Sequence, residues 1–447
     1  MRARIAILIG LVGLGGWLLA PAAARAEGKV RTTKLGSVII KSNCSPAEVK
    51  SVGKKIQRCL DTFDDFYAEF RLRKKNDNRL VARVFATRDE FEQFYQKDGG
   101  GFSGTPLAYF SPSLNAIVLS AKAEEIFLSR LLLHECAHQY LNRYTYHAPN
   151  WLNEGLSETF EGWSVTDQGV VHKPNLMDLM ILQEALRKDD YLPLEELMSM
   201  NPLLFREFAK RHPDLHSYLH YCTSWGLVYY CLEGPDKELR NRLITYVRDL
   251  NKIGDRAKFE VGDPAAFEAR WKEYILGIDP KRENAEDHIV VASGFRSVDD
   301  FDRAIVEYEA ALEKDPEAEA VQYWLGYCIK RSGGSYEIAA QHLEKAMLED
   351  PTDPSPAYML SRMALGIDRR SVQPDPVRAL EYAMIALDLS GGRSPLYLWL
   401  VARCHAAAGK FELATRQMRR AIKYAAEDRL WYEGELKKLQ EAARASG

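Results

Sequence analysis

Residues 131–140 read LLLHECAHQY, and residues 149–158 read PNWLNEGLSE. If residues 123–143 form a helix, His134 and His138 lie one turn apart on one face, where two imidazoles can hold a single zinc ion. The glutamate between them projects beside that ion, where it can take a proton from an attacking water. A catalytic zinc has three protein ligands, so this pattern requires one more.

The second stretch supplies a third ligand. Pro149 interrupts the chain, Asn150 can cap a new helix, and Glu154 lies in about the first turn of that helix. Fifteen residues separate Glu154 from the second histidine, which is enough for the new helix to turn back against the first. Glu158 follows one turn later, where its carboxylate can accept the free ring N–H of a ligand histidine and fix its tautomer. We therefore predict a zinc (Zn2+) site with Glu135 as general base.

Together the two stretches resemble the active-site core of gluzincin metallopeptidases, most closely the peptidase-MA-like domains of secreted bacterial proteins. The shared residues are HECAH at 134–138 and WLNEGLSE at 151–158. The resemblance covers residues 30–275 and implies an α+β zincin-like domain with a small mixed sheet and active-site helices. It also implies a zinc ligand set and a general base at matching positions, namely His134, His138, Glu154 and Glu135. The connection between the second histidine and the glutamate is shorter than in thermolysin-like members, so no substrate preference is implied.

A blander interpretation of the same residues is a buried helix whose histidines bond to each other or to the backbone. A chain of this composition contains a His-Glu-x-x-His pattern by chance about two times in a hundred. The second stretch, with its glutamates at the required spacing, favours the metal site over that alternative.

Residues 1–26 are predicted to be a secretory signal. Arg2 and Arg4 precede an apolar run of 16 residues at 5–20, and Ala24-Arg25-Ala26 offers a small-x-small cleavage site. The alternative is a membrane anchor, but the run is shorter than the about 20 residues that a span needs. We therefore expect a secreted or periplasmic protein without a stable membrane span after signal removal. The formal net charge of −3 gives no support to nucleic-acid binding.

Residues 27–122 are predicted to be an N-terminal α/β subdomain. The expected elements are a strand at 30–41, a helix at 46–70, a strand at 80–86, a short helix at 89–95 and a hairpin of strands at 107–110 and 116–119. In the resembled family, the sheet edge nearest the metal binds the substrate backbone as an added strand. We hypothesise that this edge strand is formed by Leu107, Ala108, Tyr109 and Phe110. The alternative interpretation of these four residues is an ordinary core strand.

Residues 123–280 are predicted to be the zinc-binding helical subdomain, with further helices at 176–187, 203–210 and 215–232. In the last of these, YCTSW at 221–225 resembles the Tyr-x-x-Ser-aromatic segment that follows the zinc site in related sequences. A phenol near the metal can donate to the oxyanion of a tetrahedral intermediate. We select Tyr221 for this catalytic role, and the alternative is a core tyrosine with its hydroxyl at the surface.

Seven cysteines permit disulfides in an exported protein without requiring them. Cys44 and Cys59 could form a bridge if Cys44 folds back onto the helix that contains Cys59. Cys136, between the two histidines, points away from the metal face and is interpreted as a core residue.

Residues 290–447 are predicted to be an all-α tetratricopeptide-repeat solenoid. A small, large, small pattern recurs after 35, 40 and 35 residues, at Ala304-Tyr308-Ala311, Ala339-Leu343-Ala346, Ala379-Ala383-Ala386 and Ala414-Met418-Ala421. Small residues let neighbouring helices approach, and this register resembles tetratricopeptide repeats. Residues 428–444 are then expected to form the capping helix that such arrays require. The repeats suit extended peptides, but a fold alone does not establish a partner.

Two functions are compatible with these patterns. The first is a secreted zinc endopeptidase or aminopeptidase, in which zinc and Glu135 activate water against a peptide or protein substrate and the repeats contact a protein partner. The second is a catalytically silent metallopeptidase fold that acts as an exported binding or scaffold module. Glu135 favours the first, because a purely structural zinc site needs no base.

Overall fold

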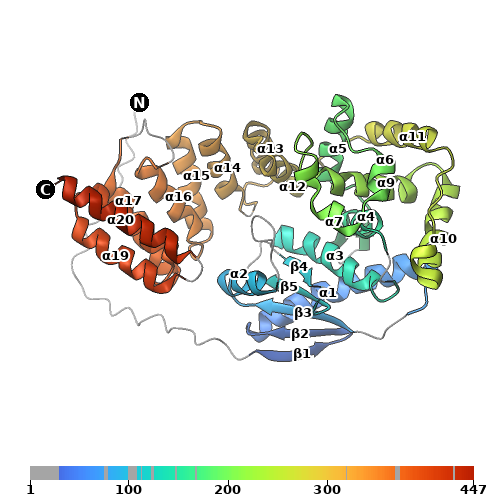
Figure 1. The fold of residues 1–447 in the computed structure, drawn as a ribbon, viewed down its shortest axis with the longest axis horizontal. Coiled ribbons are helices and arrows are strands. Elements are labelled where there is room, and N and C mark those ends of the chain that lie inside the picture. Colours follow the sequence, from blue (N-terminus) through green and yellow to red (C-terminus); the bar gives the residue numbers. More distant parts are fainter. Residues whose placement is uncertain are drawn as a thin grey trace, which may run out of the picture. The chain divides into compact units, whose positions relative to one another are not determined.

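The computed structural model describes most of the chain after residue 29 (Figure 1). The described residues are 30–74, 79–98, 108–111, 113–121, 125–145, 148–166, 169–318, 320–367, 373–425 and 428–446. They form two compact units, which comprise residues 30–351 and residues 352–446. The predicted signal at 1–26 and the predicted substrate contact Leu107 lie outside the described residues. No described helix is both long enough and apolar enough to cross a membrane.

A mixed five-stranded sheet forms the N-terminal part of the first unit. Its order is β1-β2-β3-β5-β4, with β2, β3 and β5 parallel and each outer strand antiparallel to its neighbour. The strands are β1 (Arg31–Leu35), β2 (Val38–Ser42), β3 (Leu80–Phe85), β4 (Ala108–Ser111) and β5 (Ala116–Ser120). The small mixed sheet that the sequence predicts is therefore present, and β4 is one of its edges.

The single strand predicted over 30–41 is wrong, because this segment is the hairpin of β1 and β2. Leu35 pairs with Val38 across a two-residue turn at Gly36 and Ser37. Gly36 has a φ of +56°, a left-handed conformation that glycine adopts at little cost. Alternation of side chains continues through both strands, so periodicity alone does not reveal the reversal.

The first two helices that the structure describes both pack against the sheet. α1 (Pro46–Tyr67) begins with a capping box, in which the Ser45 hydroxyl accepts from the Glu48 N–H and the Glu48 carboxylate accepts from the Ser45 N–H. α2 (Arg88–Lys97) begins with a capping box of the same kind. Phe91 of α2 packs on the sheet in a small apolar cluster. The caps are local sequence signals, which is why both helices are found where the sequence predicts them.

α4 (Asn150–Glu161) is central to the helical part of the first unit, because it packs against both α3 (Glu125–Leu141) and α9 (Leu219–Glu233). The helix predicted at 203–210 is two short helices, and the helix predicted at 215–232 begins later, with α9. The other elements are β6 (Ser164–Thr166), β7 (Gly169–Val171), α5 (Leu176–Lys188), α6 (Leu194–Ser199), α7 (Pro202–Arg206), α8 (Phe208–Arg211), α10 (Lys237–Ile253), α11 (Pro264–Gly277) and the 3-10 helices η1 (Ala68–Phe70) and η2 (Gly254–Arg256).

The repeats begin with α12 (Ala285–Ser297), α13 (Phe301–Lys314), α14 (Val321–Arg331) and α15 (Tyr336–Glu349) in the first unit. The second unit contains α16 (Ser355–Ala364), α17 (Pro376–Leu389), α18 (Pro395–Ala407), α19 (Phe411–Tyr424) and α20 (Arg429–Ser446). Within each unit, consecutive helices pack against each other. The three residues of each predicted unit are all buried, on α13, α15, α17 and α19, and in α17 the middle residue is the small Ala383. The predicted C-terminal tetratricopeptide-like helical array is confirmed, and α20 is its expected last helix.

The first repeat helix packs directly on the helical part that precedes it. α12 contacts α5, and a Cβ built on Gly294 would lie 2.7 Å from Met177 Cγ. Arg303 Nη1 on α13 also donates to Glu184 Oε2 on α5 at 2.8 Å. Helices α12 to α15 therefore belong to the same compact unit as the sheet and α4.

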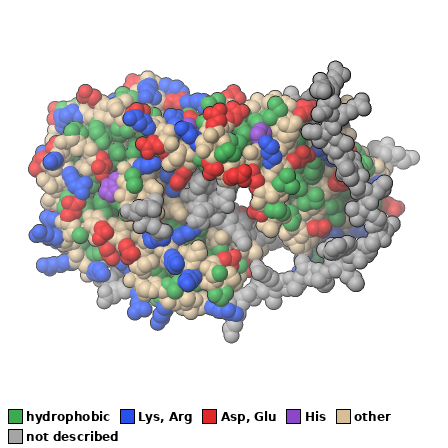
Figure 2. Space-filling model, turned by 180° about the vertical axis from the view of Figure 1, so that it is seen from behind, with side chains coloured by type: hydrophobic (Ala, Val, Ile, Leu, Met, Phe, Trp, Pro, Cys, Tyr) green, Lys and Arg blue, Asp and Glu red, His purple; other side chains and the backbone are tan. Residues whose placement is uncertain are grey.

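The surface carries both signs of charge. On the face drawn in Figure 2, Lys and Arg side chains are interspersed with Asp and Glu side chains, and hydrophobic side chains lie among them. This mixture agrees with the near balance of 60 basic and 63 acidic residues in the sequence.

We predict that Gly155→Ala destabilises the first unit. A Cβ at Gly155 would lie 2.4 Å from Ser224 O and 2.5 Å from Val228 Cγ2, both on α9, so α4 and α9 would have to separate. Overpacking of this kind costs about 1–3 kcal/mol, which lowers the unfolding midpoint measured by circular dichroism. Gly277→Ala is the matched control, because no heavy atom lies within 4 Å of a Cβ built there. Equal midpoints for the two variants would contradict the close packing.

Candidate metal centre

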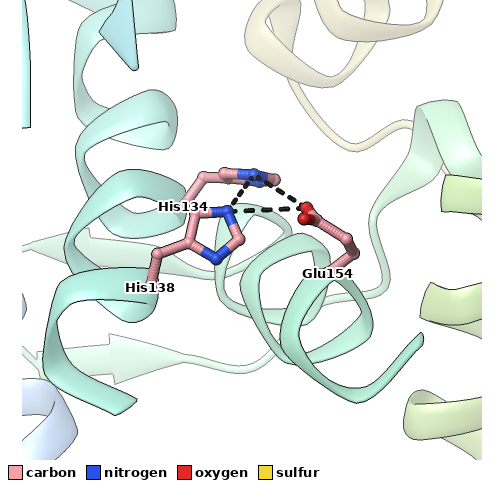
Figure 3. Close-up of side chains that lie close together, drawn as sticks. All are labelled: His134, His138 and Glu154. Atoms are coloured by element: carbon pink, nitrogen blue, oxygen red, sulfur yellow. Dashed lines mark hydrogen bonds and ion pairs between the residues drawn. The ribbon is translucent and has the colours of Figure 1, made fainter. Parts of the chain in front are cut away.

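Three side chains from two helices converge in the first unit (Figure 3). His134 and His138 lie on α3, and Glu154 lies on α4. His134 Nε2 lies 3.1 Å from His138 Nε2 and 3.7 Å from Glu154 Oε2, and His138 Nε2 lies 3.5 Å from Glu154 Oε2. The three side chains are between 10% and 18% exposed, so the centre is largely buried but reachable from solvent. The structure thus brings together the three ligands that the sequence predicts.

These spacings fit one tetrahedral zinc ion. Zinc bonds of about 2.0–2.2 Å to nitrogen and oxygen place the ligand atoms of a tetrahedron about 3.3–3.6 Å apart. The three separations lie within a few tenths of an ångström of that range. Two imidazole nitrogens and one carboxylate oxygen are also a donor set that catalytic zinc uses.

The second ring nitrogen of each histidine has its own partner, which orients the ring. His138 Nδ1 lies 3.1 Å from Ser157 Oγ, and Ser157 donates its hydroxyl proton to Asn153 O at 3.0 Å. Ser157 Oγ therefore accepts from His138 Nδ1–H, which leaves His138 Nε2 unprotonated and able to bind a metal. His134 Nδ1 lies 3.1 Å from Glu161 Oε2, which accepts in the same way.

Glu161, and not the predicted Glu158, is the nearer carboxylate to the ring N–H of His134. Glu158 Oε1 lies 3.8 Å from His134 Nδ1, because the Glu158 carboxyl group is held by other donors. Tyr218 OH donates to Glu158 Oε1 at 2.6 Å, and Asn175 Nδ2 donates to Oε2 at 3.2 Å. Sequence reasoning missed Glu161, although it stands seven residues after the ligand glutamate and so on the same helix face.

Buried carboxyl groups gather behind His134. Burial raises the pKa of Glu158 well above its ordinary value. Burial and the charge of Glu161 together raise the pKa of Asp178 to about 7. Burial also opposes the ionisation of Glu161, but the hydrogen bond from His134 lowers the pKa of Glu161 below its ordinary value. Arg130 Nη2 lies 3.9 Å from Glu161 Oε1 and favours the same ionised form. Glu161 therefore ionises more readily than Glu158 or Asp178.

The ligands themselves titrate differently. Burial, and then the charge of His134, lower the pKa of His138 to about 4, so its ring is neutral at pH 7. Burial alone would lower the pKa of His134, but Glu158 and Glu161 raise it well above its ordinary value. Burial raises the pKa of Glu154 to about 7. A divalent cation competes with protons for these atoms, so its binding favours neutral His134 and ionised Glu154.

Glu135 follows the first ligand histidine on α3 and is buried. Burial raises the pKa of its carboxyl group, against the lowering effect of the two histidines and of a hydrogen bond from the Phe110 backbone. A carboxyl group whose pKa is raised toward neutrality is a better proton acceptor than an ordinary surface glutamate. Both its place and its environment suit a general base.

β4 is the sheet edge beside this centre. α3 packs on β4, and the ring centroids of Phe110 and His138 are 6.4 Å apart. Next to Phe110, the Tyr109 hydroxyl donates to Asp98 Oδ2 at 3.0 Å, and Ala108 is buried. Substrate binding along this strand stays a prediction, with the Phe110 N–H already bonded to Glu135.

Tyr221 lies on α9, and its side chain is partly exposed. Burial raises its pKa, and the charges of Glu154, Glu158 and Glu135 raise it further. The phenol therefore stays protonated at neutral pH, as a hydrogen-bond donor requires. Its ring stacks on Tyr218, with the ring centroids 4.7 Å apart. The sequence analysis did not identify Tyr218. Its spacing of three residues from Tyr221, which places the two side chains on one helix face, was the available signal.

No protein-family model and no curated protein matches the sequence. Among solved structures, the chain is similar to a crystal structure of MamA protein, with 19% identity over 36% of this chain and 89% of that chain and a TM-score of 0.28. It is also similar to MamA 41-end from Desulfovibrio magneticus RS-1, with 14% identity, coverage of 41% and 93%, and a TM-score of 0.29. For the APC/C hetero-tetramer Cut9-Hcn1 the identity is 16%, the coverage 72% and 58%, and the TM-score 0.28. No argument about the metal centre follows from scores this low.

We predict that Glu161→Ala weakens zinc binding about 10–100-fold, because it removes the acceptor that orients His134. Competition with a chelator of known zinc affinity measures the change, and circular dichroism checks the fold. Ser157→Ala tests the same role at His138. Glu238→Ala is the matched control, since that side chain is 66% exposed on α10. Control-like affinity in Glu161→Ala would contradict the orienting role.

Proposed function

We propose that this chain is a zinc-dependent peptidase of the gluzincin type. The observation that carries the proposal is the tetrahedral spacing of His134, His138 and Glu154, with Glu135 beside them. A zinc ion held there would act as a Lewis acid toward a peptide carbonyl and the attacking water. The resemblance of both sequence stretches to gluzincins supports the same reaction class.

Glu135 would take a proton from the water that attacks the carbonyl and then pass it to the leaving amine. Burial raises its pKa, which makes the carboxylate a stronger proton acceptor than an ordinary glutamate. The hydrogen bond from the Phe110 backbone holds its carboxylate on β4, so the base is positioned before substrate arrives.

Tyr221 would donate a hydrogen bond to the oxyanion that develops on the substrate. Burial, and then three carboxyl groups of the site, raise its pKa, which keeps the phenolic proton in place. A fixed donor of this kind stabilises the transition state more than the bound substrate. The role therefore affects kcat more than KM.

We also propose that the helical repeats contact a protein partner or a protein substrate. Helices α12 to α15 belong to the same compact unit as the metal centre, so a chain bound to them is tethered to the unit that would cleave it. The predicted signal at residues 1–26 would deliver this activity to a secreted or periplasmic location.

Glu135→Gln is expected to lower peptide turnover about 10²–10⁴-fold while bound zinc is retained, because the amide cannot act as a base. Zinc is measured by elemental mass spectrometry, and turnover is measured on an unfolded protein and a peptide library. Glu238→Gln, on the exposed side of α10, is the matched control.

Turnover that survives in Glu135→Gln would show that Glu135 is not the base. Stoichiometric zinc in the wild type without turnover of any library member would favour the second candidate, a catalytically silent binding or scaffold module. The observation that favours this second candidate is the set of helical repeats, which would serve a binding or scaffold role.

Tyr221→Phe is expected to lower kcat about 10²-fold with little change in KM, because it removes a donor to the oxyanion, worth about 3 kcal/mol. Tyr229→Phe is the matched control on the same helix. A change confined to KM would indicate that Tyr221 contacts bound substrate instead of the transition state.

A further inference from the structure

α1 and α3 pack side by side in a fixed register. The rings of Phe63 and Tyr140 have centroids 5.4 Å apart, and those of Tyr67 and Tyr144, one turn later, have centroids 6.4 Å apart. Both pairs are separated by 77 residues in the sequence. Tyr144 lies in the turn that follows α3. Because the offset is constant, the two segments run in the same direction along this contact, and the last turns of α1 face the end of α3 and the turn after it.

One turn before these pairs, the same offset places Cys59 opposite Cys136. Both side chains are buried, with 4% and 0% exposure, and both thiols are free. After burial, the neighbouring Cys59 side chain is the largest influence on the pKa of the Cys136 thiol, which it raises. The bridge from Cys59 to Cys44 that the sequence allowed is not formed: neither residue is in a disulfide, and the Cys44 sulfur lies 3.8 Å from Val84 O on β3.

We propose that Cys59 and Cys136 are a disulfide-forming pair that can join α1 covalently to the helix carrying both metal-binding histidines. Helix axes about 8–10 Å apart, with Cα atoms about 2.3 Å from each axis, place directly facing Cα atoms about 3.4–5.4 Å apart. A disulfide spans about 4.4–6.8 Å between Cα atoms, so little backbone movement is needed.

The reaction needs an oxidant of the low-molecular-weight disulfide class, such as oxidised glutathione. Two S–H bonds break and one S–S bond forms between Cys59 and Cys136. The two electrons and two protons pass to glutathione disulfide, which is released as two molecules of reduced glutathione. Because the thiols are buried, exchange occurs when the contact between α1 and α3 opens locally. An exported chain meets such oxidants, whereas a cytosolic chain stays reduced.

Oxidation would stabilise the metal-binding helix. The cross-link closes a long loop that includes α2 and most of the sheet, so it restricts the unfolded chain more than the folded one. The inference does not depend on peptidase activity, and it holds equally for a silent binding module.

The test uses the full chain, equilibrated in oxidised glutathione or in reductant, then denatured and treated with an alkylating reagent. Peptide mapping by mass spectrometry is expected to show residues 59 and 136 joined in the oxidised sample and both alkylated in the reduced one. Cys231 is the internal control, because it is buried on α9 and should be alkylated in both samples. The oxidised wild type should also unfold several degrees higher than the reduced wild type, and Cys59→Ser should show no such difference.

Alkylation of both Cys59 and Cys136 after oxidation would overturn the proposal. A bridge from either residue to another cysteine would overturn it equally. If Cys59→Ser does not fold, Cys136→Ser replaces it in the stability comparison, while the mapping of the wild type decides the pairing alone. Loss of zinc or of turnover plays no part in this readout, so a failure here and a failure of the proposed peptidase are distinguishable.

Discussion

The packing of α4 against α3 is the constraint on which the rest of the structure depends. It brings two imidazoles and several carboxyl groups into a largely buried space, where each polar atom without a partner costs free energy. Neighbouring segments supply those partners: Ser157 for His138, Glu161 for His134, and Tyr218, the residue before α9, for Glu158. Loss of one partner would leave a buried group unsatisfied, so the fold and the candidate centre support each other.

The rigidity of this arrangement comes from three neighbours. Gly155 lets the backbone of α9 approach α4 more closely than any residue with a Cβ would allow. The aromatic pairs of α1 with Tyr140 and Tyr144 hold the C-terminal end of α3 and the turn that follows it. From the sheet, the Phe110 N–H on β4 holds the carboxylate of Glu135. A metal centre or catalytic group tolerates errors of only about half an ångström, and such precision requires packing on several sides.

In the repeats, as between α4 and α9, small residues allow helices to pack closely. Alanines at the contact positions let each helix approach its neighbours, and Gly326 brings α14 so close to α15 that a Cβ there would lie 2.9 Å from Ala339 O. Four repeat helices belong to the compact unit that contains the candidate metal centre, and α12 packs directly on α5. From α12, packed contacts run through α5 and α9 to α4, which carries Glu154.

The sequence by itself determined what depends on neighbours along the chain. The caps of α1 and α2, the one-turn spacing of His134 and His138, and the repeat pattern of small residues are all local, so pattern reasoning located them. Tertiary structure alone decided what depends on how helices cross. Glu158 and Glu161 occupy the same face of α4. Only the packing of α3 and α9 against that face decides that Glu161 bonds to His134 and that Glu158 bonds to the Tyr218 hydroxyl. The sequence also could not predict that Cys59 neighbours Cys136, because local periodicity carries no information about residues 77 positions apart.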